Sequence, residues 1–264
     1  IVDSNPKLIS IDTETISLED KTPIGIGIAV SPVDIFYFPT YPEISPLVPY
    51  KLLEDPSVVK VLHNAPFDLD ALDLLAIETD RKFDVHNIRD TSVMARLLMK
   101  PDASLQWLAY EVDMEYHETA AELMKKHSAK EMIDIPEEEV ALHCLRDARE
   151  TLILYHKFLP QTDMAYFIIE MAIIPILLSM SKIGFKIDQE LRAQLEEKLI
   201  KEVEFYRGLC EGYGFNPGSS QQVGYTLAKR GTFLPFTRRN KYSDRKSKLN
   251  LATGKEILEF VSDP

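Results

Sequence analysis

Cysteine is scarce in this 264-residue sequence, which contains only Cys144 and Cys210. The two lie far apart and in no spacing typical of a metal site, so neither a disulfide framework nor a zinc site is indicated. This composition favours a reducing compartment. The chain also begins without a charged segment followed by an apolar one, and without an initiator methionine. We therefore expect a piece of a longer protein that is cytoplasmic or organellar and not secreted.

Long hydrophobic runs are lacking too. The most apolar stretch, residues 164–180, is interrupted by Glu170 and Pro175. It is shorter than the roughly 20 residues that a bilayer span requires. We predict a buried helix here and no association with a membrane. Apolar residues nevertheless make up 45% of the chain, enough for the cores of one large domain or two ordinary ones.

Basic residues are few in the first part of the chain. Residues 1–163 contain 30 acidic against 15 basic residues, whereas residues 164–264 contain 12 against 15. Within the second part, residues 229–248 contain eight Lys or Arg and one acid, Asp244. The net charge of −12 argues superficially against a nucleic-acid partner, but a basic window of this kind is able to contact phosphates. From composition alone, a solvated loop explains the window equally well.

Hydrophobic alternation predicts strands early in the chain, at residues 7–12, 24–30, 34–39 and 58–63. Short turns join the first three strands into a meander. Helices are predicted over residues 66–76, 90–99 and 104–111, with Asp90 and Ser104 as N-caps of the last two, and a further helix begins near Pro136. Strands followed by helices that alternate with strands indicate a mixed α/β sheet domain.

A polar, proline-containing break at residues 160–163 marks a domain boundary. It divides the chain into an α/β domain over residues 1–163 and a mostly helical part over residues 164–264. In the second part, a long helix carries an apolar stripe from Leu191 to Tyr206, which is more typical of a core face than of a binding site. A shorter helix over residues 220–230 leads into the basic window.

Four acidic residues stand at positions that such a sheet could bring to one edge. Asp12 and Glu14 lie two apart on the first strand and therefore point to the same side. Asp68 lies in the first turn of the helix after the fourth strand. Asp147 lies one helical turn after His143. Close carboxylates need a compensating cation, and all-oxygen ligands select Mg²⁺ or Mn²⁺. Paired divalent ions recur in displacement at phosphorus, which suggests phosphodiester hydrolysis.

The motifs D-T-E at residues 12–14, N-A-P-F-D at 64–68 and H-C-L-R-D at 143–147 follow one another in a recognisable order. This order resembles the three motifs of the DEDD 3′–5′ exonucleases, specifically the proofreading domain of family A DNA polymerases. The resemblance extends beyond that domain. Residues 173–188 are similar to the segment that opens the polymerase region, and residues 215–231 are similar to part of the polymerase thumb.

The resemblance implies a ribonuclease H-like fold over residues 1–163, followed by a partial, mostly helical thumb. It also implies a site for two divalent ions, Mg²⁺ or Mn²⁺, with a division of roles among the matched residues. Asp12, Glu14 and Asp147 would hold one ion, and Asp12 would also reach the second, with Asp68 positioning that ion through water. The residues expected near the terminal nucleotide are Thr13, Asn64 and Phe67, the last standing where many relatives have Tyr.

His143 departs from the family pattern. Family A exonucleases have Tyr at this position, with three residues between it and the last Asp. The other DEDD branch has His, with four residues between it and the last Asp. An imidazole, with an unperturbed pKa near 6.5, is able to accept a proton at neutral pH, whereas a phenol, near 10, mostly orients the water. His143 is therefore expected to act as general base or to hold the water as Tyr would. A drifted position in a weakened site is the third interpretation.

The leading hypothesis is a monomeric fragment of a DNA polymerase, from a bacterial or phage-infected cell or an organelle, that lacks the palm and fingers. Its partner would be DNA, with a single-stranded 3′ end at the exonuclease site and duplex backbone at the thumb. There Arg238, Arg239 and Lys241 would contact phosphates. One alternative is an RNase D-like RNA exonuclease, although the thumb-like segment does not resemble RNA-binding domains. The other is an inactive DNA-binding module, against which stands the retention of all four acids.

Overall fold

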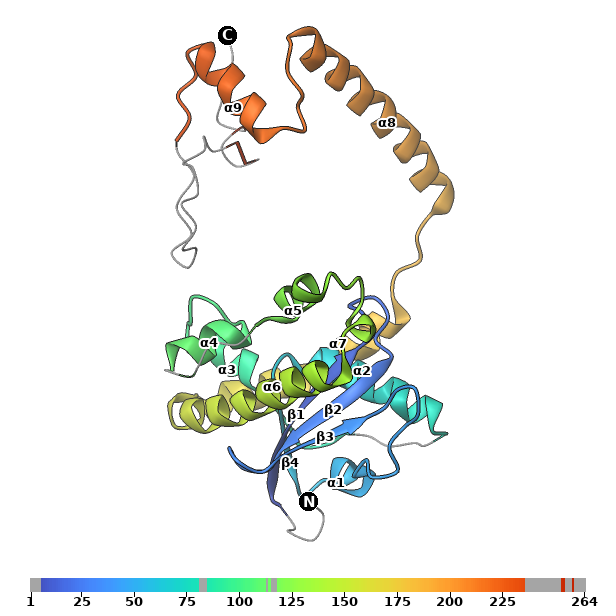
Figure 1. Ribbon diagram of the computed structural model, residues 1–264, viewed down its shortest axis with the longest axis vertical. Helices are drawn as coiled ribbons and strands as arrows, with labels where there is room; N and C mark the ends of the chain where they lie inside the picture. The colour runs from blue at the N-terminus through green and yellow to red at the C-terminus, as the bar shows by residue number, and fades with distance from the viewer. Residues whose placement is uncertain are drawn as a thin grey trace. The chain divides into compact units, whose positions relative to one another are not determined.

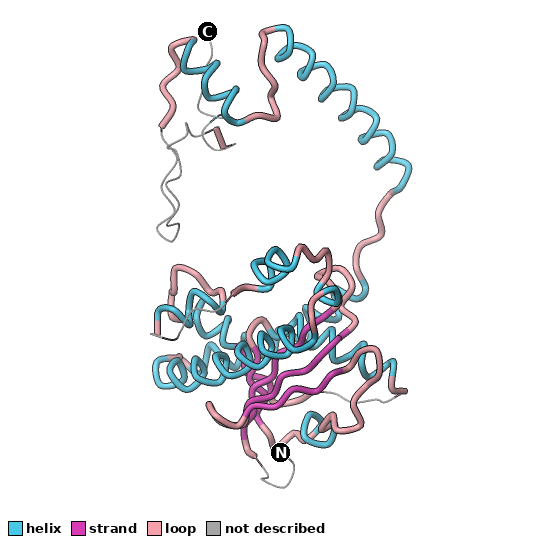
Figure 2. The backbone as a smooth tube through the Cα atoms, in the orientation of Figure 1, coloured by secondary structure: helices cyan, strands magenta, loops and turns pink. Residues whose placement is uncertain are grey.

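The structure is a computed structural model that describes residues 6–80, 85–112, 114, 118–235, 253–254 and 258. It divides into two compact units, Ile1–Gly184 and Phe185–Pro264. The fold of the first unit is built on a five-stranded sheet (Figures 1 and 2). The strands are β1 (Leu8–Thr15), β2 (Pro23–Ala29), β3 (Ile35–Pro39), β4 (Val59–Leu62) and β5 (Ile88–Asp90).

The sheet has the order β3-β2-β1-β4-β5. Strands β1, β2 and β3 pair antiparallel, which confirms the predicted meander, and β1, β4 and β5 pair parallel. The predicted mixed α/β architecture is therefore correct. Strand β5 was not predicted, because its three residues are too short to show alternation.

Helices flank the sheet, and most of those predicted are present within two or three residues. The described helices of the first unit are α1 (Tyr50–Glu54), α2 (Ala65–Glu78), α3 (Thr91–Leu97), α4 (Leu105–Glu111), α5 (Ala120–His127), α6 (Glu137–Phe158) and α7 (Met164–Ile183), with the 3₁₀ turns η2 (Met132–Asp134) and η3 (Leu159–Gln161). Asp90 caps α3 as predicted, whereas the Ser104 side chain makes no capping bond to α4.

Helices α2 and α6 cover opposite faces of the sheet. Ile9 and Ile11 of β1 pack in one apolar cluster with leucines of α2. The residue between them, Ser10, donates a hydrogen bond from Oγ to the carbonyl oxygen of Ala148 in α6, at 2.6 Å. Because successive strand residues point to opposite faces, even-numbered residues of β1 face α6 and odd-numbered ones face α2. Figure 1 shows α6 lying across the sheet.

Glycine at position 27 allows α6 to approach the sheet closely. A Cβ atom built on Gly27 would lie 2.8 Å from the carbonyl oxygen and 2.9 Å from the Sγ of Cys144. Asp12 pairs with Gly27 across the β1–β2 ladder. The missing side chain therefore brings the turn of α6 that contains Cys144 directly over the strand that carries Asp12.

Helix α7 packs against α2, α3 and β5 and lies in the first compact unit, which runs to Gly184. The predicted domain boundary at residues 160–163 stays a prediction. The prediction of a buried helix is wrong, because only Phe167 and Ile174 of α7 are buried. Apolar side chains such as Ile168 (59% exposed) and Ile176 (58%) face outward. By length and composition alone, α7 would be able to cross a membrane.

The second unit contains α8 (Gln189–Gly212) and α9 (Ser220–Lys229), which confirms that this part is helical. Asp188 caps α8 by accepting hydrogen bonds from the backbone N–H groups of Glu190 and Leu191. The apolar stripe of α8, for which a core face was expected, is about half exposed, with Leu195 at 48% and Leu199 at 56%.

Candidate active site

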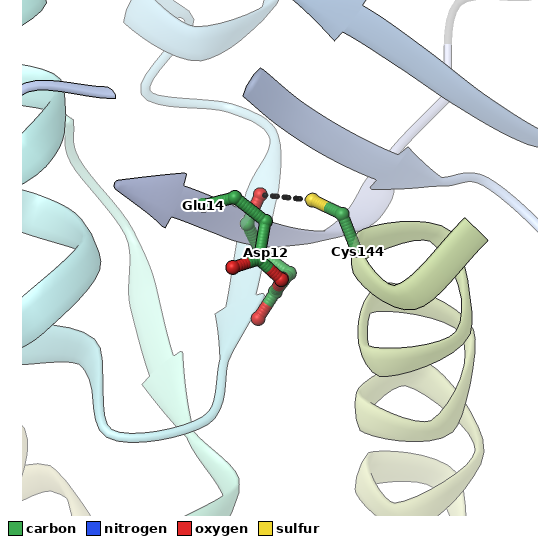
Figure 3. Close-up of side chains that lie close together, drawn as sticks. All are labelled: Asp12, Glu14 and Cys144. Carbon is green, nitrogen blue, oxygen red and sulfur yellow. Dashed lines mark hydrogen bonds between the residues drawn. The ribbon is translucent and has the colours of Figure 1, made fainter. Parts of the chain in front are cut away.

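Asp12 and Glu14 project from the same face of β1, toward α6. Glu14 is buried and Asp12 partly buried. The thiol of Cys144, on α6, donates a hydrogen bond to the backbone carbonyl oxygen of Asp12, with a sulfur–oxygen distance of 3.5 Å (Figure 3). One donor atom from each of these three residues lies within 4.8 Å of the others. The predicted proximity of the two carboxylates on one side of the strand is therefore present.

Asp68 reaches the same edge from α2, on the opposite face of the sheet. Its Oδ1 accepts hydrogen bonds from the backbone N–H of Thr13 at 2.9 Å and from the Thr13 hydroxyl at 2.8 Å. Thr13 is the odd-numbered residue between the two β1 carboxylates, so it faces α2. Thr13 thus fixes the Asp68 carboxylate beside β1, a contact that the sequence did not reveal. Its expected role in substrate binding stays a prediction.

His143 and Asp147 complete the cluster from α6. Both are buried, with His143 at 6% and Asp147 at 9% exposure. The Nε2 of His143 lies 3.8 Å from the Oε1 of Glu14, and its Nδ1 lies 3.9 Å from the Oδ1 of Asp147. Each ring nitrogen therefore faces a carboxylate at a distance longer than a direct hydrogen bond. The four acids and the histidine predicted from three separate motifs come together in one site.

The electrostatic environment of this cluster opposes its negative charge. Burial raises the pKa of Asp12 well above its ordinary value, and the charges of Asp147, Glu14 and Asp68 raise it further. Burial, followed by the charges of Asp147 and Asp68, likewise raises the pKa of Glu14. Burial raises the pKa of Asp68 to about 7, although the two hydrogen bonds from Thr13 oppose the shift. For Asp12, Glu14 and Asp68, the described residues provide no Lys or Arg ion pair.

This donor set fits a hard divalent cation. Carboxylate oxygens are the ligands that Mg²⁺ and Mn²⁺ prefer, and a cation would relieve the repulsion that raises these pKa values. Cys144 is a poor candidate ligand even though it is near. Burial and the charge of Asp12 raise the pKa of its thiol, and metal binding requires the thiolate. Asp12, Glu14, Asp68 and Asp147 are therefore the residues that would hold such ions.

A groove of about 580 Å³ opens beside Asp12 and Asp147. Its lining includes Asn64, which the sequence predicted, and several residues that it did not predict: His63, Ser92, Arg96, Asp102, Ala103, Ser104, Leu105 and Gln106. His63 is adjacent to a recognised motif, so its neighbourhood could have been anticipated. Nothing in the spacing of the α3–α4 residues marks them, because loop geometry brings them to the groove. We refer to this feature as the substrate groove.

Asn64 and Phe67 lie at the start of α2. Asn64 has a left-handed backbone conformation, with φ of 67°, and its N–H donates to the Oδ1 of Asp90 at 3.1 Å. The N–H of Ala65 donates to the other oxygen of Asp90, at 2.8 Å. Phe67 is partly buried, and the ammonium group of Lys21 lies 5.3 Å from its ring centre. The predicted thumb residues Arg238, Arg239 and Lys241 lie outside the described residues.

Comparison with protein families identifies this arrangement. Residues 2–163 match the model of the 3′–5′ exonuclease family. The chain belongs to this family. The mixed sheet with flanking helices is accordingly the ribonuclease H-like exonuclease fold. No curated protein sequence matches the chain.

Solved structures share the fold at low sequence identity. NrnC of Brucella melitensis with bound Mg²⁺ has 16% identity and a TM-score of 0.51, over 68% of this chain and 87% of that one. NrnC bound to pGG has 17% identity and a TM-score of 0.51, over 68% and 86%. The POL domain of Pol1 from M. smegmatis, in complex with DNA primer-template and dNTP, has 15% identity and a TM-score of 0.52. That likeness covers 95% of this chain and 41% of the other.

Proposed function

We propose that the chain is a fragment of a family A DNA polymerase whose exonuclease domain removes nucleotides from the 3′ end of DNA as 5′-monophosphates, as in proofreading. The observation that carries this proposal is the convergence of Asp12, Glu14, Asp68 and Asp147 at one sheet edge in a member of the exonuclease family. The polymerase context is supported by the structural likeness to Pol1, which extends past residue 163 over 95% of the chain.

Two divalent ions, Mg²⁺ or Mn²⁺, would be held by the four carboxylates. When bound, such ions would activate a water and stabilise the negative charge that develops on the phosphate. Thr13 contributes by holding Asp68 in place with two hydrogen bonds. Asn64, in the groove, and Phe67, on the same helical turn, would contact the terminal nucleotide.

His143 would act on the attacking water. Its ring lies between Glu14 and Asp147, at 3.8 and 3.9 Å, so a water that contacts either carboxylate is within reach of the imidazole. The ring would either accept the proton of that water or hold the water for attack, as a Tyr hydroxyl would.

In the second unit, Arg238, Arg239 and Lys241 would contact duplex backbone through phosphates. Neutralising all three should weaken duplex binding and flatten its salt dependence, whereas hydrolysis of short single strands should continue. Equal loss of duplex binding and of single-strand hydrolysis would show that the basic window is not a separate duplex-binding element.

A second candidate function is removal of 3′ residues from short RNA. It is favoured by the likeness to NrnC, which covers 86% of that chain in the complex with pGG. A competition experiment decides between the two. DNA and RNA of one sequence, labelled at the 5′ end with different dyes, are incubated together with the protein and Mg²⁺. Faster shortening of the DNA supports the polymerase reading, and faster shortening of the RNA overturns it in favour of the RNA exonuclease.

A further inference from the structure

The charge of the substrate groove is unevenly distributed. Among the residues that line it, Asp12, Asp102 and Asp147 are acidic, and Arg96 is the single Lys or Arg. A nucleic-acid strand carries one negative charge per phosphate, so it enters this groove against three carboxylates. Divalent ions would neutralise the scissile phosphate beside Asp12 and Asp147. They would leave the phosphates farther along the strand to be neutralised by the protein.

Arg96 is positioned to neutralise a phosphate of the strand. It lies on α3, its side chain is exposed, and it lines the groove together with Ser92 of the same helix. Within the part of the chain that the structure describes, no hydrogen bond or ion pair engages its guanidinium group. Burial lowers the pKa of the neighbouring His63 imidazole, and the positive charge of Arg96 lowers it further. The charge of Arg96 therefore acts inside the groove.

The helix that carries Arg96 is anchored to the catalytic framework. Asp90 accepts hydrogen bonds from the first turn of α3, with the N–H of Ser92 at 2.8 Å, and also from the N–H groups that begin α2. The His63 ring bonds Thr91 Oγ1 at 2.8 Å and the carbonyl oxygen of Ala103 at 2.9 Å. These hydrogen bonds hold the backbone of α3, which carries Arg96, to the start of α2, which carries Asp68.

We propose that Arg96 binds a non-scissile phosphate of the substrate strand, on the 5′ side of the linkage that is hydrolysed. A guanidinium group pairs with phosphate through two parallel hydrogen bonds, which makes it suited to fixing the register of a strand. Ser104 and Gln106 add neutral polar groups to the same wall. This role rests on the proposed function, because it assumes that the groove receives a nucleic-acid strand whose 3′ end lies at the carboxylates.

The test measures binding separately from turnover. Short single-stranded DNA with a 5′ fluorescein is titrated with the full 264-residue chain, and anisotropy is followed with Ca²⁺ in place of Mg²⁺. Arg96→Gln should weaken binding about tenfold, because one charge-assisted contact is lost. It should also reduce the slope of log K against log salt by about 0.7, the value for one phosphate of a single strand. Arg149→Gln is the matched control, since Arg149 is exposed on α6 and does not line the groove.

Replacing one phosphate at a time with an uncharged methylphosphonate locates the contact. With the wild-type chain, one upstream substitution should weaken binding about tenfold, and in Arg96→Gln that same substitution should have no further effect. Arg96→Lys should recover part of the affinity. The inference is overturned if Arg96→Gln behaves like Arg149→Gln, or if the loss couples to the scissile linkage or equally to every linkage.

The same proteins and oligonucleotides separate this inference from the proposed function. If the wild-type chain shortens DNA with Mg²⁺ but no linkage couples to Arg96, the exonuclease stands and the phosphate contact is refuted. If coupling to one upstream linkage is found while Mg²⁺ and Mn²⁺ produce no shortening, the contact is supported and the proposed activity fails.

Discussion

Removal of the Asp68 charge should stabilise the metal-free protein. Asparagine at this position keeps an oxygen that is able to accept both hydrogen bonds from Thr13, at 2.9 and 2.8 Å, so the substitution removes the charge and little else. The pKa of Asp68 in the folded protein is about 7, against an ordinary value of 3.8. That difference corresponds to about 4 kcal/mol of lost unfolding free energy once the carboxyl is ionised.

The effect of the Asp68 charge on the unfolding free energy depends on pH, because the folded and unfolded states bind the Asp68 proton with different affinity. Because the folded protein binds the Asp68 proton more tightly than the unfolded chain, the wild-type unfolding free energy falls as pH rises from 3.8 toward about 7, and then levels off. The asparagine variant lacks this loss. We expect Asp68→Asn to match the wild type near pH 4 and to exceed it above pH 7 by up to about 4 kcal/mol, or roughly 10 °C in melting temperature.

The single tryptophan provides a probe that is confined to the first unit. Trp107 lies on α4 and packs against the core that includes residues of α3 and α6. Thermal unfolding followed by its fluorescence, in EDTA and across this pH range, measures the difference. Mn²⁺ should then stabilise the wild type more than the variant, because the variant lacks one ligand charge. A variant that is less stable than the wild type at every pH would refute the electrostatic reasoning.

Three further predictions concern the framework and the mechanism. Asp90→Asn places an N–H₂ group against backbone donors such as that of Ala65, and should lower the unfolding free energy by about 3 kcal/mol in chemical denaturation. Gly27→Ala puts a methyl group 2.8 Å from the carbonyl oxygen of Cys144, and should lower both melting temperature and exonuclease rate by displacing α6. Wild-type stability of Asp90→Asn, or wild-type stability and exonuclease rate of Gly27→Ala, would contradict the corresponding prediction. If His143 is the general base, the pH–rate profile of the wild type should show a break that His143→Tyr loses. The same profile in both proteins would mean that His143 only holds the water.

The sequence reveals those parts of the site that have a local signature. Alternation on β1 places Asp12 and Glu14 on one side, and helical periodicity places His143 and Asp147 together, because each pattern depends only on backbone geometry. The resemblance to the exonuclease motifs then joins these segments. The contact between Thr13 and Asp68 has no such signature, since it depends on how α2 packs on the back of the sheet.

Other features depend on tertiary structure in the same way. Arg96 reaches the groove only because α3 and α4 form one of its walls. The sequence of α7 predicts a buried helix, yet α7 packs one face on the rest of the first unit and exposes the other, with Phe167 buried and Ile168 at 59% exposure. Composition records how apolar a helix is, but not how much of it another element covers.

The most direct test of the account is the action of the full chain on single-stranded DNA labelled at its 5′ end, with Mg²⁺. We expect the DNA to shorten from its 3′ end with release of nucleoside 5′-monophosphates, and the shortening to stop when EDTA is added. Asp12→Asn/Glu14→Gln should leave the DNA intact while keeping the Trp107 unfolding transition. Undegraded DNA with the wild-type chain, or equal shortening by the double variant, would contradict the claim that these carboxylates form an exonuclease site.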